Sequence, residues 1–297
     1  MRIDVLDLEF QGMPHVIAAF LLRGPGGIAL IETGPATTLP VLLRRLSEHS
    51  VEPEAVRDVL VTHIHLDHAG AAGWWARRGA RIHVHPLGLP HLVDPSKLVA
   101  SASRIYGDRM ESLWGEIVPV PADRVVAVSD RTEIVVAGER ILALETPGHA
   151  GHHLVFVLGD AAFSGDAAGI RLPGQAWIDL PAPPPEFDLG AWRTTLLRLR
   201  GAGARTLYRT HFGASSGVDE QLDTFADLLE TGAAWVREML EQGLERERMI
   251  EEFASRMRER ATAQGVDAAT ARAYELANPR SMSVDGIARY WKRRSGG

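Results

Sequence analysis

The sequence contains no cysteine, which excludes disulfide bonds, thiolate metal ligands and a cysteine nucleophile together. Any metal ion that the protein binds must therefore be held by nitrogen and oxygen atoms. No run of 18 apolar residues occurs, so the sequence predicts no membrane-spanning helix. Residues 1–10 also lack the basic region and the long apolar run of a signal peptide. We therefore expect a soluble, cytoplasmic protein.

The sequence also lacks an excess of positive charge, because 32 lysine and arginine residues are outnumbered by 38 aspartate and glutamate residues and the formal net charge is −6. An acidic chain has no broad field that would attract phosphate groups, although residues 292–294 form a short basic segment. We expect a small-molecule substrate, no nucleic-acid partner and no membrane partner, and we leave open whether the protein is a homodimer. The composition is 45% hydrophobic and 24% charged, which is ordinary for a globular chain that buries a substantial core.

Potential metal ligands are most concentrated in residues 62–70, which read THIHLDHAG. His63, His65, Asp67 and His68 lie within six positions, directly after an apolar run that predicts a buried strand. A chain with 12 histidines places some of them together by chance. Imidazole and carboxylate groups are nevertheless the donors that suit zinc, iron or manganese, and four of them here follow one strand end. One ion could take His63 and His65, and a second could take Asp67 and His68.

Further potential ligands follow three later predicted strands. His149 follows a strand over residues 140–145, Asp166 follows a hairpin that ends at residue 164, and His211 follows a short strand over residues 205–209. Four strand ends that each carry a ligand type fit one rim of a sheet sandwich. We therefore expect these side chains to converge.

Other segments predict the surroundings of this site. Residues 3–10, 16–22 and 27–32 indicate an antiparallel meander whose last residue, Glu32, either orients a ligand histidine or is an exposed acid. Residues 95–116 predict one or two amphipathic helices that pack in the core or cover the site. The proline-rich residues 180–187, with Trp177 upstream, predict a stiff loop that walls a pocket.

Three histidines outside these loops receive a structural interpretation. His83 and His85 share one face of a predicted strand over residues 81–85, but Pro86 follows at once and no carboxylate accompanies them. His91 is interpreted in the same way.

Taken together, the HxHxDH motif at residues 63–68 and the later His149, Asp166 and His211 resemble the metallo-β-lactamase superfamily over roughly the first 215 residues. The resemblance implies a four-layer αββα sandwich of the α/β (α+β) class in residues 1–216, followed by a helical extension in residues 217–297. It implies two divalent metal ions, with zinc as the first expectation and iron or manganese as alternatives. The implied ligands are His63, His65 and His149 for one ion, Asp67, His68 and His211 for the other, and Asp166 as the bridge.

The segment Thr146 to His149, with His153 beyond it, looks like the glyoxalase II branch of that superfamily. This likeness implies hydrolysis of a small thioester or ester by a hydroxide between the metals, with Asp67 and Asp166 as catalytic residues. The main alternative is a persulfide dioxygenase with a single iron held by His63, His149 and Asp166. Lesser alternatives are a lactonase and a metal-binding protein without catalytic activity.

Two departures from the family pattern bear on these alternatives. Glu32 stands where the superfamily usually has aspartate, so the contacts behind the ligands differ. Asp166 is followed by Ala167, Ala168, Gly169 and Ile170, without the nearby tyrosine of the lactonase relatives, which weakens the lactonase hypothesis. Antibiotic hydrolysis is not expected, because the best-known secreted enzymes have cysteine at the position of Asp166.

Overall fold

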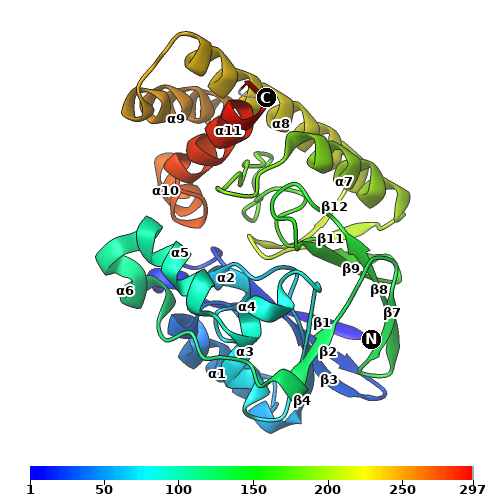
Figure 1. The fold of residues 1–297 in the computed structure, drawn as a ribbon. Coiled ribbons are helices and arrows are strands. Elements are labelled where there is room, and N and C mark those ends of the chain that lie inside the picture. The colour runs from blue at the N-terminus through cyan, green and yellow to red at the C-terminus, as the bar shows by residue number, and fades with distance from the viewer. Residues whose placement is uncertain (296–297) are drawn as a thin grey trace.

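The computed structural model describes residues 1–295, and within them two six-stranded sheets pack face to face with helices on both outer sides (Figure 1). This arrangement confirms the expected αββα sandwich. The first sheet has the order β1-β2-β3-β4-β5-β6 and the second β12-β11-β10-β9-β8-β7. The strands of the first sheet are β1 Arg2–Asp7, β2 Ala18–Gly24, β3 Gly27–Ile31, β4 Val56–Leu60, β5 Arg81–Val84 and β6 Val125–Ala127.

The first sheet changes from antiparallel to parallel pairing at β3. Strands β1, β2 and β3 form the predicted meander, whereas β3, β4, β5 and β6 run parallel. Ile31 at the end of β3 pairs with Leu60 at the end of β4. Since parallel strands end at the same edge, Glu32 and residues 62–70 are brought side by side.

The second sheet contributes three further loops to the sandwich. Its strands are β7 Glu133–Val136, β8 Glu139–Glu145, β9 Leu154–Leu158, β10 Ala161–Phe163, β11 Thr206–Arg209 and β12 Gly213–Ser216. The predicted β9–β10 hairpin is confirmed, and β10 runs parallel to β11. Strand β12 was not predicted, because its small and polar residues show no apolar alternation.

Three hydrophobic clusters correspond to the three interfaces between the four layers. The cluster between the sheets includes Phe20 of β2 and Phe163 of β10, whose ring centroids lie 5.3 Å apart. The outer face of the first sheet packs against a layer that includes Trp75, which is fully buried. The helices of this layer are α1 Leu39–Glu48, α2 Leu66–Ala69, α3 Ala72–Ala76, α4 Leu89–Val93, α5 Ser96–Tyr106 and α6 Met110–Trp114. Helices α5 and α6 confirm the amphipathic helices predicted for residues 95–116.

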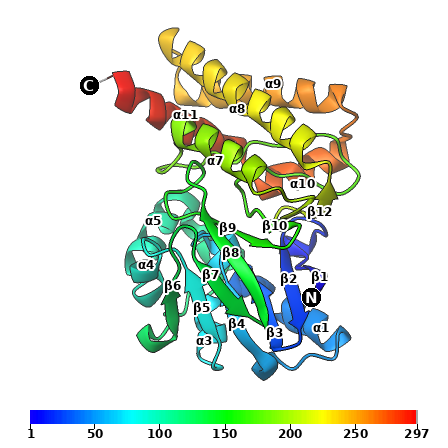
Figure 2. The same ribbon diagram turned by 90° about the vertical axis from the view of Figure 1, so that its right-hand side faces the viewer.

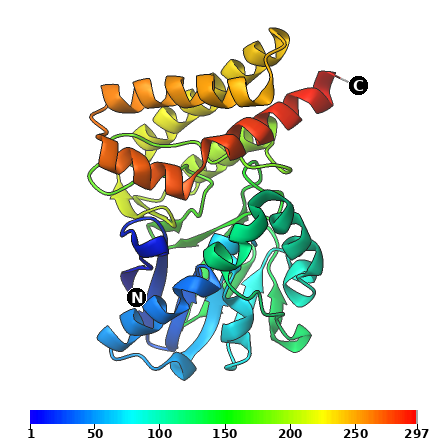
Figure 3. The same cartoon turned by 90° about the vertical axis from the view of Figure 1, so that its left-hand side faces the viewer.

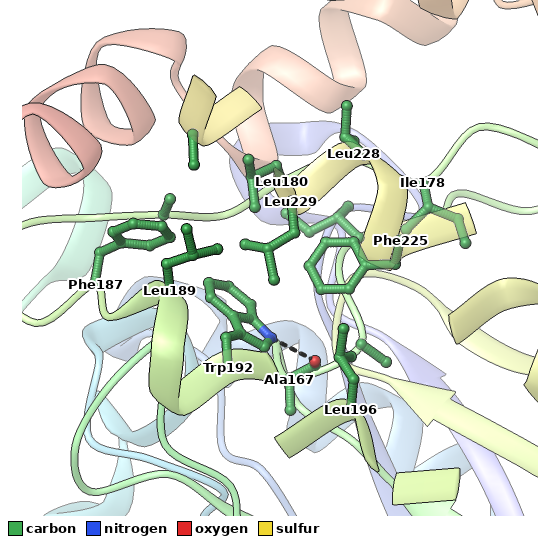
Figure 4. Packing of buried hydrophobic residues seen from close by; sticks show 14 of the residues in the cluster. Ala167, Ile178, Leu180, Phe187, Leu189, Trp192, Leu196, Phe225, Leu228 and Leu229 are labelled. Carbon is green, nitrogen blue, oxygen red and sulfur yellow. Dashed lines mark hydrogen bonds between the residues drawn. The ribbon is translucent and has the colours of Figure 1, made fainter. Parts of the chain in front are cut away.

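Helices α7, Leu189–Gly201, and α8, Val218–Glu241, pack together on the outer face of the second sheet. Figure 4 shows Trp192 of α7 among Leu196 and the α8 residues Phe225 and Leu229. The indole Nε1 of Trp192 donates a hydrogen bond to the carbonyl oxygen of Ala167 at 2.8 Å. Helix α7 was not predicted from the sequence, although its packing ties the loop after β10 to the helical layer.

The remaining helices are α9 Arg246–Ala263, α10 Ala268–Ala277 and α11 Arg280–Ser295. They belong to the same hydrophobic cluster as the second sheet, through residues such as Phe253, Tyr274 and Ile287. In Figures 2 and 3 the C-terminal helices lie together at one end of the sandwich. The domain boundary expected after residue 216 stays a prediction, and apolar packing runs across it. Within residues 1–295 no helix combines the length and apolar character of a membrane span.

Candidate metal centre

The first set of converging donor atoms consists of three imidazole nitrogens. The loop after β4 carries His63 and His65, and the loop after β8 carries His149. His65 Nδ1 lies 2.9 Å from His63 Nε2 and 2.9 Å from His149 Nε2. These three nitrogens could therefore contact a single ion, as the sequence predicts.

The second set consists of one carboxylate oxygen and two imidazole nitrogens. Asp67 Oδ2 lies 3.6 Å from His68 Nε2 and 3.3 Å from His211 Nε2. Asp67 and His68 lie within the short helix α2, whereas His211 follows β11. The side chains of two distant segments thus meet above the edge of the sandwich.

Asp166 lies between the two sets and directs a different oxygen at each. Its Oδ1 is 3.5 Å from His68 Nε2 and 3.7 Å from His211 Nε2. Its Oδ2 is 3.4 Å from His149 Nε2. This geometry is what a carboxylate that bridges two cations requires. The structure therefore brings all seven predicted ligand residues together.

Unpaired buried atoms test whether these residues fit metal ions. Within residues 1–295, His68 Nε2, His211 Nε2 and Asp166 Oδ1 are buried and have no hydrogen-bond partner. A buried polar atom without a partner costs about 1–3 kcal/mol, and here three such atoms face one another. A cation would satisfy all three, and nitrogen and oxygen donors suit zinc, iron and manganese. The residues present thus fit two divalent ions.

The far ring nitrogens of two ligand histidines are held by backbone carbonyl groups. His149 Nδ1 donates to the carbonyl oxygen of Pro181 at 2.8 Å, and His211 Nδ1 donates to that of Val16 at 2.6 Å. A hydrogen on Nδ1 leaves the lone pair on Nε2, the atom that faces the site. The backbone therefore fixes both the tautomer and the direction of these two rings.

Glu32 performs the same task for the loop after β4. The carboxylate is fully buried, and its Oε1 accepts hydrogen bonds from Thr62 Oγ1 at 2.5 Å, Thr210 Oγ1 at 3.1 Å and His68 Nδ1 at 3.1 Å. His63 Nδ1 donates in turn to Thr62 Oγ1 at 3.1 Å. Of the two roles considered for Glu32, the structure supports the one that orients a ligand histidine.

Burial keeps the first imidazole set neutral. Desolvation lowers the pKa of His65 to about 3 and that of His149 to about 3, and it also holds the pKa of His63 well below its usual value. A neutral imidazole is the form that binds a metal ion. These rings therefore need not lose a proton before they act as ligands.

The second set carries excess negative charge. Burial would lower the pKa of His68, but the charges of Asp67, Glu32 and Asp166 raise it to about 10. Burial would also lower the pKa of His211, yet Asp166 and Asp67 raise it. The carboxylates at this position thus favour a positive charge beside them, and a divalent ion supplies one.

A pocket of about 480 Å³ opens directly over this site. His65, Asp67, His149 and Asp166 lie at its base. The prediction that the proline-rich loop walls a pocket is confirmed by Pro181 and residues 183–185. The further walls are α5 and the turn between α10 and α11.

One expectation about the surroundings of the site was wrong. Trp177 does not line the pocket, because its side chain is buried in the hydrophobic cluster under α8. His91 lines the pocket but belongs to none of the groups of potential metal ligands found in the described residues, which leaves its structural interpretation uncontradicted. The structural interpretation holds for His83 and His85, which contact Asp58 at 2.7 Å and Glu145 at 3.1 Å respectively.

Several supporting contacts were not predicted from the sequence. His153 Nε2 accepts a hydrogen bond from the backbone N–H of Asp166 at 3.2 Å and so fixes the start of that loop. Thr62 and Thr210 each precede a ligand histidine. A repeated Thr-His pair at two strand ends is the signal that could have identified both threonines. The carbonyl groups of Val16 and Pro181 leave no such signal.

Comparison with known proteins places these features in context. A family model described as the metallo-beta-lactamase superfamily matches residues 12–211. A metallo-beta-lactamase fold-containing protein of Sulfurisphaera tokodaii is 29% identical over 144 residues, which cover 47% of this chain and 54% of that protein. The atrochrysone carboxyl ACP thioesterase of Aspergillus fumigatus is 25% identical over 174 residues, which cover 58% of this chain and 43% of the thioesterase. The chain spans about half the length of the curated relatives it matches.

Solved structures show the same fold over a larger share of the chain. A metallo-beta-lactamase family protein from Thermus thermophilus superimposes with a TM-score of 0.68 at 22% identity. The match covers 99% of this chain and 94% of that protein, so the C-terminal helices have a counterpart there.

Proposed function

This chain belongs to the metallo-beta-lactamase superfamily, and from that premise we propose that it is a metal-dependent hydrolase of a small thioester or ester. The position of Asp166 carries the proposal, since its two oxygens face two separate donor sets. The similarity to a thioesterase from Aspergillus fumigatus supports a thioester substrate.

The chemistry that two divalent ions supply when bound is activation of a water molecule and polarisation of a carbonyl group. The chain itself holds the ligand side chains in place. His63, His65 and His149 form one neutral set of donors, whereas Asp67, His68 and His211 form an acidic set beside it. Asp166 spans both sets and holds them at a fixed separation.

Asp67 has a second role in this proposal, as an acceptor for the attacking water. Burial would raise its pKa, but the imidazoles of His68 and His211 lower the pKa well below the usual range. The carboxylate is therefore ionised at neutral pH and can accept a hydrogen bond from water. Because it lines the base of the pocket, it can orient that water toward a carbonyl carbon placed there.

The single-iron oxygenase is the competing proposal. It uses His63, His149 and Asp166 and gives no task to the second set. The buried and unpaired Nε2 atoms of His68 and His211 favour the hydrolase, because two ions would give every donor a partner.

The test starts from protein purified without added metal. We expect close to two metal ions per chain, hydrolysis of thioesters and no oxygen uptake with thiol or persulfide substrates. Asp166→Ala should abolish hydrolysis, whereas Asp123→Ala, at an exposed position outside the site, should leave it unchanged. One iron per chain with substrate-dependent oxygen uptake would instead support the oxygenase.

A further inference from the structure

One face of helix α5 lines the pocket over the candidate metal centre. The lining residues recur one helical turn apart and are Lys97, Leu98, Ser101, Ala102, Ile105 and Tyr106. Positions with this spacing project from the same side of a helix. Ser103 and Arg104 are exposed and do not line the pocket. Helix α5 therefore presents a defined surface to whatever enters.

Large apolar side chains are exposed on this pocket. Ile105 is 42% exposed and Leu87 is 62% exposed, and both line it. Solvent exposure of such side chains is unfavourable, and inside a concave site it indicates contact with an apolar ligand. The exposed leucine and isoleucine thus argue for an apolar ligand independently of the metal-binding residues.

The opposite wall is largely apolar as well. Its apolar part is formed by the prolines of residues 183–185 and, from the C-terminal helices, by Ala277, Pro279 and Met282, while Glu186 and Asn278 of the same segments add polar groups. Proline side chains give a rigid surface, and methionine adapts to irregular apolar shapes. The volume of about 480 Å³ falls within the range of about 300–1,000 Å³ of pockets for drug-sized ligands. A short acyl group such as acetyl would leave most of it unfilled.

A single lysine adds a positive charge to this helix face, whose other lining residues are apolar except for Ser101 and Tyr106. Lys97 is exposed and lines the pocket, and it forms no ion pair within the described residues 1–295. It is one of two lysines in the whole sequence. An ammonium group beside an apolar surface suits a molecule that has an apolar part and an anionic part.

We propose that this pocket binds a thioester or ester whose acyl group is a medium-length aliphatic or aromatic group, with an anionic group of the carrier against Lys97. The inference rests on the proposed function for the reacting carbonyl group. The contacts of the acyl chain with α5, the prolines and the α10–α11 turn define the substrate class.

The experiment compares acetyl, butyryl and octanoyl thioesters of coenzyme A with the same acyl groups on N-acetylcysteamine, an uncharged carrier. Each buried methylene contributes about 0.8 kcal/mol, so kcat/KM should rise about fourfold per methylene until the pocket is filled. Lys97→Glu should raise KM for the coenzyme A thioesters by a clearly larger factor than KM for the thioesters of the uncharged carrier. Equal changes for both carriers would overturn the assignment of the anionic group to Lys97.

Two matched substitutions test the helix face itself. Ser101→Trp places a large side chain in the pocket, and Ser103→Trp places the same side chain on the exposed side of α5. We expect Ser101→Trp to remove the preference for octanoyl over acetyl thioesters and Ser103→Trp to keep it. Should Ser101→Trp fail to fold, Leu98→Ala is the second variant, and it should lower the ratio of octanoyl to acetyl kcat/KM. An unchanged preference in the folded pocket variant overturns the proposal.

A binding measurement separates this proposal from the proposed function. Octyl and ethyl thioethers of coenzyme A cannot be hydrolysed, and their Kd values can be measured by calorimetry. Tighter binding of the octyl compound without hydrolysis of any thioester would reject the hydrolase and support the pocket. Hydrolysis without any preference for the longer acyl group would retain the hydrolase and reject the acyl pocket.

Discussion

The two halves of the candidate metal centre are assembled in different ways. His63, His65, Asp67 and His68 come from one segment after β4, whereas His149, Asp166 and His211 come from three loops of the second sheet. Within the first segment, Thr62 and the adjacent strand-end residue Glu32 hold the rings. The later ligands depend on groups from distant parts of the chain.

The supports of the later ligands show this dependence. His149 is held by the carbonyl group of Pro181, and His211 by that of Val16, which precedes it by 195 residues. The loop of Pro181 is itself fastened to the C-terminal helices. Asn278 Nδ2 donates to the carbonyl oxygen of Leu180 at 2.8 Å. The comparison teaches that the first half of the site is a local structure, and the second half is a product of the whole fold.

Removal of the metal should have the largest effect, and it should change hydrogen exchange differently in the two halves of the site. We expect dialysis against a chelator to abolish hydrolysis and to lower stability by about 4 kcal/mol for each ion that had been at 1,000 times its Kd. Residues 62–70 should keep their amide protection in hydrogen exchange, while residues 147–153 and 165–170 should lose it. Equal loss of protection in both halves would contradict the comparison.

Arg280→Met tests the support that the C-terminal helices give to the later ligands. Arg280 Nη1 lies 2.6 Å from both carboxylate oxygens of Asp179, which is fully buried. Removal of one partner of a buried ion pair costs about 3–5 kcal/mol, so the free energy of unfolding should fall by about that amount in urea denaturation. Arg272→Met, at an exposed position on α10, is the matched control and should change stability little.

The same substitution should also affect catalysis through His149. Asp179 and Asn278 are hydrogen-bonded to each other and hold residues 179–181 in place, so their release loosens the Pro181 carbonyl group. At a temperature where the variant remains folded, kcat should fall, while the ion at Asp67, His68 and His211 should remain bound. Wild-type kcat in a folded Arg280→Met protein would show that the C-terminal helices do not position His149.

The sequence predicts the local half of the site more completely than the other half. The HxHxDH spacing identifies its ligands within six residues. His149, Asp166 and His211 could be assigned only because each follows a predicted strand and because their order resembles a known family. The directions of the His149 and His211 rings were beyond sequence reasoning, since backbone carbonyl groups that accept hydrogen bonds belong to every residue type.

The fold shows a related division. The strands with clear apolar alternation and the amphipathic helices were predicted, whereas β12 and α7 were not. Strand β12 consists of glycine, alanine and serine and exists because Leu207 and Tyr208 of β11 offer it hydrogen-bonding partners. The pocket walls were predicted in part, because the proline-rich loop is visible in sequence. The inward position of His91 depends on how α4 packs.

Glu32→Gln should have an intermediate effect confined to one ion. The substitution keeps the side-chain volume and removes the charge that faces His68 Nδ1. Loss of a contact behind a metal ligand typically lowers metal affinity about 10–100-fold. We expect metal titration to show weaker binding of the ion at Asp67, His68 and His211 and unchanged binding of the ion at His63, His65 and His149. Equal weakening of both would indicate that Glu32 supports the site as a whole.

A matched pair of threonine substitutions should produce the smallest effects and the finest comparison. Thr62 and Thr210 both donate to Glu32 Oε1, at 2.5 Å and 3.1 Å, and they lie in opposite halves of the site. Thr62 also accepts a hydrogen bond from His63 Nδ1. Valine keeps the shape of threonine and removes the hydroxyl group. A hydrogen bond to a charged group contributes about 1.5–3 kcal/mol, so both variants should lose stability in this range.

Their effects on metal binding should differ. Thr62→Val leaves His63 Nδ1 without its acceptor and should therefore weaken the binding of the ion at His63, His65 and His149. Thr210→Val breaks a contact with Glu32 but no contact with a ligand ring. Metal titration followed by denaturation of the loaded and metal-free proteins measures both quantities in each variant. Thr210→Val could also weaken the binding of this ion as strongly as Thr62→Val does. That result would show that both hydroxyl groups act through the charge of Glu32 and that the contact with His63 is secondary.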